Sequence, residues 1–327
     1  MQSAPGGDGR FSAAVRINGE LHSIPTDLPS HAIFPIYSIT KTLTAICVLR
    51  LVETGSLRLF DTACRWLPEV SIPTTITLTH LLRHTSGLRD YGPVPEYHEA
   101  VRAHPERPWT RQQFLDAVLA KGMLSAPGKR FSYSNVGYML LIDIAERVTG
   151  QTFAKLVSDF VTKPLGLQNT TVLEQLDDLM RCVPGFGSEV SSNGRSVDVR
   201  GLYHPGWCAP RLIASTTDDV TRVFDRLIAG DILEPSTLTA MLTLAPLSDH
   251  PNEIHSGGMG VYADGSSTRG RHYHHGGGGP GYDLDATVYP DTPIGRVSIA
   301  VFVNSSGGPR ANDCEATLLA RLLDADV

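Results

Sequence analysis

Ser38 and Lys41 stand three positions apart at the start of an apolar segment, residues 42–52. A segment with so few polar residues is typical of a buried helix. On a helix, positions i and i+3 lie on the same face, so the Lys41 amine can reach the Ser38 hydroxyl. Burial disfavours the ammonium form and favours the free amine that a proton acceptor needs. The positive end of the helix dipole favours negative charge developing beside the serine. The pair therefore predicts an activated serine nucleophile.

The same spacing also suits a capping serine followed by a surface lysine, so the short motif needs support from elsewhere in the chain. Tyr133 and Asn135 precede an apolar helix that begins at Val136, and His275 precedes a glycine-rich run, residues 276–281. Taken singly, Tyr133 and Asn135 suit a loop that caps the next helix, and the glycine-rich run suits a turn with a bulge.

Taken together, the motifs Ser38-x-x-Lys41, Tyr133-x-Asn135 and His275-x-Gly277 resemble, in order, those of the serine β-lactamase and penicillin-binding-protein superfamily. The resemblance is to the class C β-lactamase, D-peptidase and esterase branch, and it covers about residues 34–305. It implies a serine hydrolase that forms an acyl-serine intermediate without a metal or organic cofactor.

Each motif residue has a predicted role. Ser38 attacks an acyl carbon and Lys41 accepts its proton. A phenol with a pKa of about 10 is normally a poor base, but a neighbouring lysine cation favours the phenolate, so Tyr133 is predicted to carry protons to the leaving group and from water. Asn135 offers an amide that holds Lys41 or the substrate amide.

The resemblance also implies an oxyanion hole built from the N–H groups of Ser38 and Gly278, with His275 and Gly277 beside the substrate. His275 stands where β-lactamases and transpeptidases usually have lysine, and a neutral imidazole attracts a carboxylate far less than an ammonium does. This motif is more similar to those of D-aminopeptidases, related peptidases and esterases than to those of penicillin hydrolases. Arg211 lies where relatives carry Gly-Gly, and it either binds a substrate carboxylate or is a solvated loop arginine.

The remaining histidines do not indicate a metal site. His272, His274 and His275 lie on a predicted strand, where neighbouring side chains point to opposite faces of the sheet. No carboxylate cluster lies near them in the sequence. His80 and His84 lack the glutamate of a HExxH motif and are predicted to pack structurally.

The elements that position these residues are strands near both termini and helices between them. Apolar residues alternate over 11–17, Asn18-Gly19 predicts a hairpin turn, and 20–24 is a return strand. Predicted helices are one that begins at Ser38 and ends at Gly55, and then 77–84, 111–121, 136–148 and 153–161. Predicted strands are 257–262, 271–275, 284–289 and 297–303. The last helix carries an apolar stripe of Cys314, Leu318, Leu319, Leu322 and Leu323.

This order predicts an α+β fold in which both termini build one antiparallel sheet flanked by helices, with a mainly helical region inserted. We expect residues 1–58 and 202–327 to form the sheet region, residues 59–201 the helical region, and the active-site cleft to lie between them. The loops 89–107 and 177–210 are expected to set specificity.

Composition limits the class of protein. The 327 residues are 41% hydrophobic and 19% charged, with a net charge of -6, which argues against a nucleic-acid or anionic-membrane partner. No apolar run approaches the roughly 20 residues of a membrane span. The first ten residues contain no apolar leader segment, and the five cysteines are scattered, so we expect reduced thiols and a cytoplasmic location. The oligomeric state is not predicted.

The sequence thus predicts a serine hydrolase acting on a small ester or amide. Two alternatives stay open. One is an acyltransferase of specialised metabolism that uses the same acyl-enzyme, and the other is a non-enzymatic ligand-binding or sensor protein on the same fold.

Overall fold

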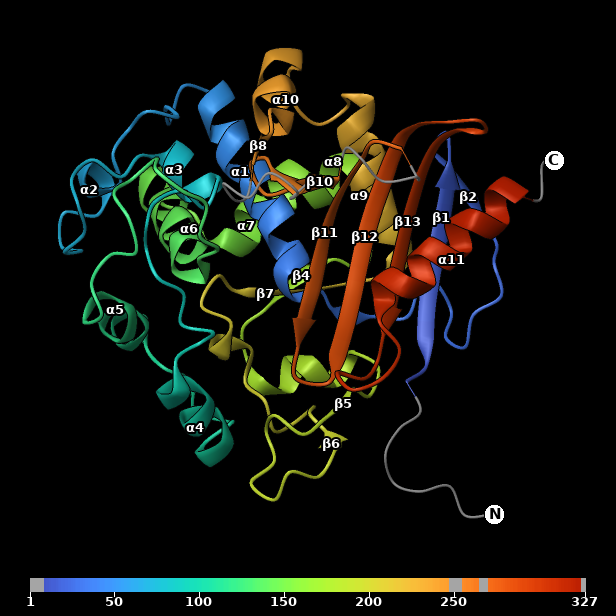
Figure 1. Cartoon of the computed structure of the whole chain (residues 1–327), viewed down its shortest axis with the longest axis horizontal. Helices are drawn as coiled ribbons and strands as arrows, with labels where there is room; N and C mark the ends of the chain where they lie inside the picture. Colours follow the sequence, from blue (N-terminus) through green and yellow to red (C-terminus); the bar gives the residue numbers. More distant parts are fainter. Residues whose placement is uncertain (1–8, 247–254, 265–269, 325–327) are drawn as a thin grey trace.

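The computed structural model describes residues 9–246, 255–264 and 270–324 (Figure 1). The predicted absence of an apolar leader segment rests on the first ten residues, and residues 1–8 of that stretch lie outside the described ranges. Within it, eight strands form one antiparallel sheet in the order β2-β1-β13-β12-β11-β10-β9-β8. Their bounds are β1 Phe11–Ile17, β2 Glu20–His22, β8 Ala245–Pro246, β9 His255–Gly257, β10 Tyr262–Asp264, β11 His272–Gly279, β12 Tyr282–Thr292 and β13 Gly295–Val303.

Both ends of the chain contribute to this sheet. Strand β1 pairs with β13 from Phe11 opposite Val303 to Ile17 opposite Val297, and β13 pairs with β12 on its other side. The predicted α+β architecture, with an antiparallel sheet built from both termini, is confirmed.

Helices cover both faces of the sheet, and the alternation along β13 shows why. Val297, Ile299 and Val301 pack in a cluster with α11, Ala311–Asp324, whereas Ala300 and Phe302 belong to the main core. That main core includes the apolar residues of α9, Thr217–Ala229. Side chains at successive strand positions point to opposite faces, so a strand that is buried on both faces has apolar residues at nearly every position. The predicted apolar stripe of α11 packs against the sheet as expected.

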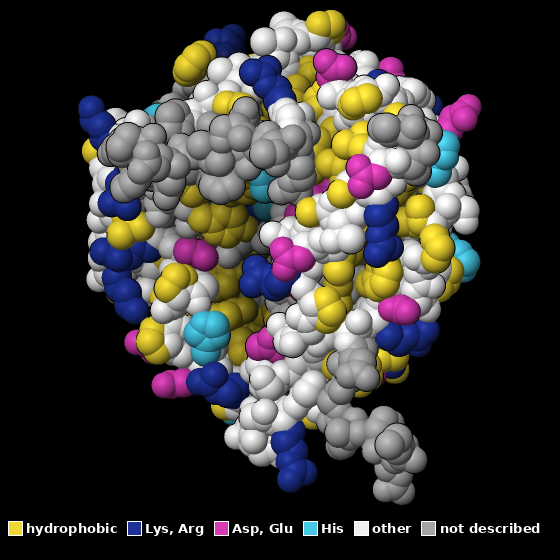
Figure 2. All heavy atoms as spheres, turned by 45° about the vertical axis from the view of Figure 1, so that its right-hand side comes forward, with side chains coloured by type: hydrophobic (Ala, Val, Ile, Leu, Met, Phe, Trp, Pro, Cys, Tyr) yellow, Lys and Arg dark blue, Asp and Glu magenta, His cyan; other side chains and the backbone are white. Residues whose placement is uncertain are grey.

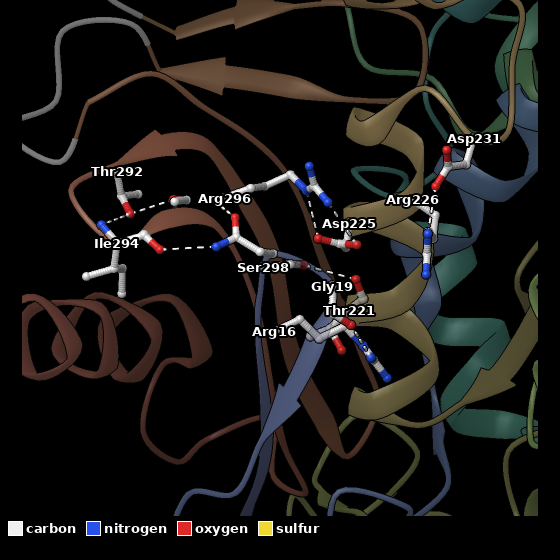
Figure 3. A network of polar contacts seen from close by, with 12 residues as sticks. Arg16, Gly19, Thr221, Asp225, Arg226, Asp231, Thr292, Ile294, Arg296 and Ser298 are labelled. Carbon is white, nitrogen blue, oxygen red and sulfur yellow. Dashed lines mark hydrogen bonds and ion pairs between the residues drawn. The ribbon is translucent and has the colours of Figure 1, made fainter.

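Helix α9 is also fixed to the sheet by polar groups (Figure 3). The Arg296 guanidinium of β13 donates to the buried Asp225 carboxylate of α9 at 2.7 Å. Ser298 Oγ donates to the carbonyl oxygen of Thr221 at 3.1 Å. These contacts hold α9 on the face of the sheet opposite α11 (Figure 1).

The helical side of the molecule is built around two buried helices in contact, α1 and α6. Their bounds are Thr40–Glu53 and Asn135–Thr149, and Gly55 and Gly150 take positive φ values just after them, as expected for helix ends. The other helices are α2 Ala63–Trp66, α3 Leu78–Leu82, α4 Pro95–Ala103, α5 Arg111–Leu119, α7 Phe153–Val157, α8 Lys163–Leu165 and α10 Pro235–Leu242. No helix in the described ranges has both the length and the apolar character needed to cross a membrane.

Several predicted boundaries were wrong. The first helix does not begin at Ser38, because Tyr37–Ile39 form a 3-10 turn ahead of α1. The predicted helix 153–161 changes into a π-helical turn at Ser158–Thr162. The predicted strand 257–262 is the end of β9, a turn and the start of β10, because Gly260, with a φ of 72°, allows the chain to reverse. Helices α2, α4, α8, α9 and α10 were not predicted.

A small sheet places the 3-10 turn. Strands β3, Phe34–Pro35, and β4, Thr171–Leu173, flank β7, Leu212–Ser215. The Ile36 N–H donates to the carbonyl oxygen of Ile213 at 2.7 Å. The turn that carries Ser38 is thereby tied to a strand about 175 positions later in the chain.

Candidate active site

Ser38 lies on a strained turn between β3 and α1. The preceding residue, Tyr37, has a φ of 39°, a left-handed value that is rare for a residue with a side chain. The Tyr37 hydroxyl donates to the carbonyl oxygen of Pro280 at 2.8 Å, and its ring packs so closely on Gly279 that a Cβ there would lie 2.1 Å from it. The turn is therefore held by the glycine-rich end of β11.

Three reactive side chains meet at this turn. The Ser38 Oγ lies 2.7 Å from the Tyr133 hydroxyl, and the Lys41 Nζ donates to the same Oγ at 3.2 Å. The Lys41 Nζ also lies 4.8 Å from the centre of the Tyr133 ring. Lys41 is only 2% exposed. The structure thus brings together the serine, lysine and tyrosine of the first two predicted motifs, with both predicted proton acceptors within hydrogen-bond reach of the predicted nucleophile.

Asn135 is the first residue of α6, and its amide orientation is set by Asp90. One Asp90 carboxylate oxygen accepts the Asn135 backbone N–H at 2.9 Å, and the other accepts Nδ2–H at 3.1 Å. Because the amide nitrogen faces Asp90, the Asn135 side-chain oxygen is left to accept a hydrogen bond from Lys41 or a ligand. Burial raises the pKa of Asp90, and the Asn135 N–H and the Lys41 charge counteract that rise. Sequence reasoning missed Asp90, because a lone aspartate in a loop carries no motif.

The third motif lies along β11 beside the turn that carries Ser38. Strand β10 pairs with β11 only as far as His274, so among the described residues the edge from His275 to Gly279 is not covered by β10 and lies against Tyr37–Ile39. A Cβ at Gly277 would lie 2.6 Å from the carbonyl oxygen of Ile36, whereas a Cβ at Gly278 would meet nothing within 4 Å. Gly277 therefore allows the strand to approach the turn, and Gly278 faces open space.

His275 is buried and neutral. Its Nδ1 lies 2.7 Å from the carbonyl oxygen of Gly276, and because a carbonyl can only accept, Nδ1 carries the proton. Burial and then the Lys41 charge lower the pKa of His275 to about 3. The imidazole is thus an uncharged group at neutral pH.

A cavity of about 390 Å³ opens beside Ser38. Its wall holds the predicted residues Ser38, Lys41, Asn135, Arg211 and Gly278, while Tyr133, His275 and Gly277 are not among the described residues that line it. The other lining residues are Tyr37, Tyr91, Gly92, Tyr97, His98, Val101, Glu189, Tyr203, Cys208, Pro210, Gly279, Pro280, Tyr282, Asp283 and Ser306. Figure 2 shows hydrophobic side chains gathered in a hollow on one face of the molecule, with acidic and basic side chains beside it.

The tyrosines of the cavity present ring surface rather than hydroxyl groups. Tyr37, Tyr91, Tyr97 and Tyr282 donate their hydroxyls to backbone carbonyl oxygens, and the Tyr203 hydroxyl contacts the Cys208 sulfur. Burial raises the pKa of each of these phenols, so all five stay neutral. The wall is therefore suited to an apolar or aromatic group.

Arg211 borders the cavity in a strained conformation. Its φ is 64°, and its guanidinium lies 3.7 Å from the Glu146 carboxylate with 39% of the side chain exposed. The two carboxylates in the lining, Glu189 and Asp283, add negative charge to the wall. The charge of Arg211 is thus partly offset before any ligand binds. No group of three or more possible metal-binding side chains occurs among the described residues.

Comparisons with known proteins agree with this geometry. A family model described as Beta-lactamase matches residues 11–323. Penicillin-binding protein 4* of Bacillus subtilis is 26% identical over 280 residues, which are 81% of this chain and 59% of that protein. The D-alanyl-D-alanine-carboxypeptidase/endopeptidase AmpH of Escherichia coli is 26% identical over 297 residues, which are 84% of this chain and 73% of that protein.

The structure of a D-stereospecific amidohydrolase from Streptomyces sp. superposes with a TM-score of 0.80 and 27% identity, covering 91% of this chain and 90% of that one. The chain spans 59% of the length of the Bacillus relative. The family resemblance and the fold predicted from the three motifs are confirmed.

Proposed function

The chain belongs to the Beta-lactamase family, a family of serine hydrolases, and on this premise we propose that it forms an acyl-serine intermediate on a small ester or amide. The observation that carries the proposal is the contact of one serine oxygen with both the Tyr133 hydroxyl and the Lys41 amine at the edge of the cavity.

In the proposed reaction, the Ser38 proton passes to the Tyr133–Lys41 pair as Oγ bonds to the acyl carbon. The N–H groups of Ser38 and Gly278 hold the oxyanion, which the open position of Gly278 supports. The bond to the leaving alkoxide or amine then breaks, and the leaving group takes up the proton. A water molecule then gives a proton to the same pair as its oxygen bonds to the acyl carbon; the bond from that carbon to Ser38 Oγ breaks, Oγ takes the proton back, and the acid leaves.

We propose that the substrate carries an apolar or aromatic group and no carboxylate next to the scissile bond. The tyrosine rings of the cavity supply apolar surface, and the charges of Glu189 and Asp283 balance those of Lys41 and Arg211 in the lining. His275 is neutral, and Arg211 already lies beside Glu146. The likeness to a D-stereospecific amidohydrolase supports an amide as one substrate class.

Acyl transfer to an amine or alcohol is the second candidate. The ring-lined wall that suits an apolar substrate would also seat an apolar acceptor in place of water.

We also propose the cytoplasmic location that the sequence predicts, and the five free cysteines support this proposal.

The test is an activity screen with a fluorophosphonate label. Wild type and Ser38→Ala are compared on p-nitrophenyl esters, D-amino-acid amides and nitrocefin, each with and without candidate amine acceptors. Labelling and turnover that both depend on Ser38 support the hydrolase, and transfer products support the second candidate. Labelling and turnover that persist in Ser38→Ala would refute the assignment of the nucleophile.

A further inference from the structure

His84 is a buried histidine beside the reactive groups for which the reaction above has no use. It is 4% exposed, and its ring stacks on the Tyr133 ring with centres 4.5 Å apart and planes 29° apart. The same imidazole contacts the Tyr138 ring of α6 at 4.9 Å. Since Tyr138 also donates its hydroxyl to the carbonyl oxygen of Leu82, His84 rests on a fixed ring.

His84 also holds the backbone on both sides of Tyr133. Its carbonyl oxygen accepts the Ser132 N–H at 2.7 Å, and its Nδ1 accepts the Ser134 N–H at 3.1 Å. A ring nitrogen that accepts a backbone N–H carries no proton, so the proton of the neutral imidazole is on Nε2. The segment that carries Tyr133 is thereby fixed at two backbone positions and at the ring.

The environment keeps the imidazole in this form. Burial, and after it the charge of Lys41, lower the pKa of His84 well below the usual value. A protonated ring would lose the acceptor for Ser134. The backbone of His84 is left-handed, with a φ of 55°, a conformation that asparagine and histidine adopt more readily than most residues.

From these contacts we propose that His84 is a positioning residue for the reaction, which fixes the Tyr133 hydroxyl against Ser38 by ring stacking and by gripping the backbone at residues 132 and 134. The proposal rests on the proposed function, because it takes Tyr133 as the proton carrier. The ring stack fixes the orientation of the Tyr133 phenol. The two backbone contacts fix the position of the backbone from which the Tyr133 side chain extends.

Two substitutions separate the two contacts. His84→Asn keeps a side-chain acceptor for Ser134 and tolerates the positive φ, but it removes the ring. His84→Phe keeps a ring and removes the acceptor. The matched control is His80→Asn, since His80 accepts the Thr77 N–H through Nδ1 and packs at the start of α3 without contacting Tyr133.

The measurement is kcat and KM per active site titrated with fluorophosphonate, together with the thermal unfolding midpoint. We expect His84→Asn to fold, to lower kcat by about tenfold to a hundredfold and to leave KM within about twofold, because displacing a reacting group by about 1 Å has effects of this size. His80→Asn should keep the wild-type kcat. His84→Phe should also lose kcat, because Ser134 is released.

Wild-type kcat in a folded His84→Asn variant would overturn the proposal, as would equal losses in His84→Asn and His80→Asn. If His84→Asn does not fold, a folded His84→Phe with wild-type kcat would overturn it in the same way. Failure of both variants to fold would mean that His84 is needed for the fold alone, and the proposal would be wrong. Each result is read relative to wild-type turnover that depends on Ser38, so failure of the proposed function is detected separately.

Discussion

The Ser38 Oγ lies closer to the Tyr133 hydroxyl, at 2.7 Å, than to the Lys41 Nζ, at 3.2 Å. The phenol and the amine therefore share one serine, with the phenol as the nearer partner. Since the Lys41 amine also lies against the Tyr133 ring, charge on either group acts on the other.

This shared contact predicts non-additive losses. Lys41→Ala, Tyr133→Phe and the double variant should all show similarly low kcat, because removing either member disables the pair. The measurement is kcat on one p-nitrophenyl ester for the four proteins. Losses that multiply in the double variant would mean that the two groups act independently.

Substrate preference follows from the charges at the cavity. A missing charge-assisted contact to a carboxylate is worth about 1.5–3 kcal/mol, or roughly one to two decades in kcat/KM. We therefore expect neutral short-chain esters or amides to be turned over faster than nitrocefin. Arg211→Ala should lower any residual nitrocefin turnover if Arg211 leaves Glu146 to bind the carboxylate. Nitrocefin as the best substrate, unchanged in Arg211→Ala, would contradict this description of the site.

Asp90 sets the Asn135 amide, so Asp90→Asn should affect both activity and stability. An asparagine can accept only one of the two N–H groups, and its own NH₂ then faces the other. We expect kcat/KM to fall about tenfold and the free energy of unfolding to fall by about 1–2 kcal/mol. Asp116→Asn, an exposed position on α5, is the control and should change neither. A neutral result at Asp90 would mean that Asn135 keeps its orientation without the carboxylate.

The ion pairs of α9 differ in burial and should differ in their effect (Figure 3). The Asp225 side chain is 1% exposed where it meets Arg296, whereas Arg226 and Asp231 are about half exposed. Asp225→Ala should lower the free energy of unfolding by about 2 kcal/mol or more, because it leaves a cation without its buried partner. Asp231→Ala should cost less than about 1 kcal/mol. Urea unfolding of both variants checks the difference, and equal costs would contradict it.

The low pKa of His275 makes stability depend on pH. The folded protein protonates this group only near pH 3, whereas the unfolded chain protonates it near pH 6.5, so the unfolded state binds more protons between those values. Stability should therefore fall as the pH falls below about 6.5, by about 2 kcal/mol between pH 7 and pH 5 from this residue. Urea unfolding of His275→Gln should show that part of the loss removed.

His22→Gln, on the exposed strand β2, is the control for the pH experiment and should keep the wild-type difference. An unchanged pH difference in His275→Gln would mean that His275 is not the group responsible.

Regular patterns made much of the fold predictable. The alternation over 11–17 and the apolar run over 136–148 predicted the bounds of β1 and α6 to within one residue. Such patterns arise because the buried face of a strand or helix must be apolar. Helix α9, TDDVTRVFDRLIA, was missed because seven of its thirteen residues are charged or threonine. Two of the buried ones have partners on distant strands: Thr217 contacts Ser12 of β1 and Asp225 accepts from Arg296 of β13. Those partners come from remote parts of the chain, so no local sequence pattern predicts the contacts.

The site shows the same division. The residues of the first two motifs could be placed because their spacing is local. Asp90 and the stacking of His84 depend on a loop and a helix start 45 to 50 positions apart, which only the folded chain brings together. The left-handed backbone at Tyr37 and Arg211 depends equally on tertiary contacts.

The pairing of β1 with β13 also determines when the protein can fold during its synthesis. Phe11 lies opposite Val303, so β1 cannot complete this pairing until β13 has also been translated. Ser38, Lys41 and Tyr133 emerge from the ribosome long before β11, which packs against the turn that carries Ser38. Contacts so distant in sequence close slowly. The catalytic centre proposed around Ser38 therefore stays incomplete in the nascent chain until β11 has been translated.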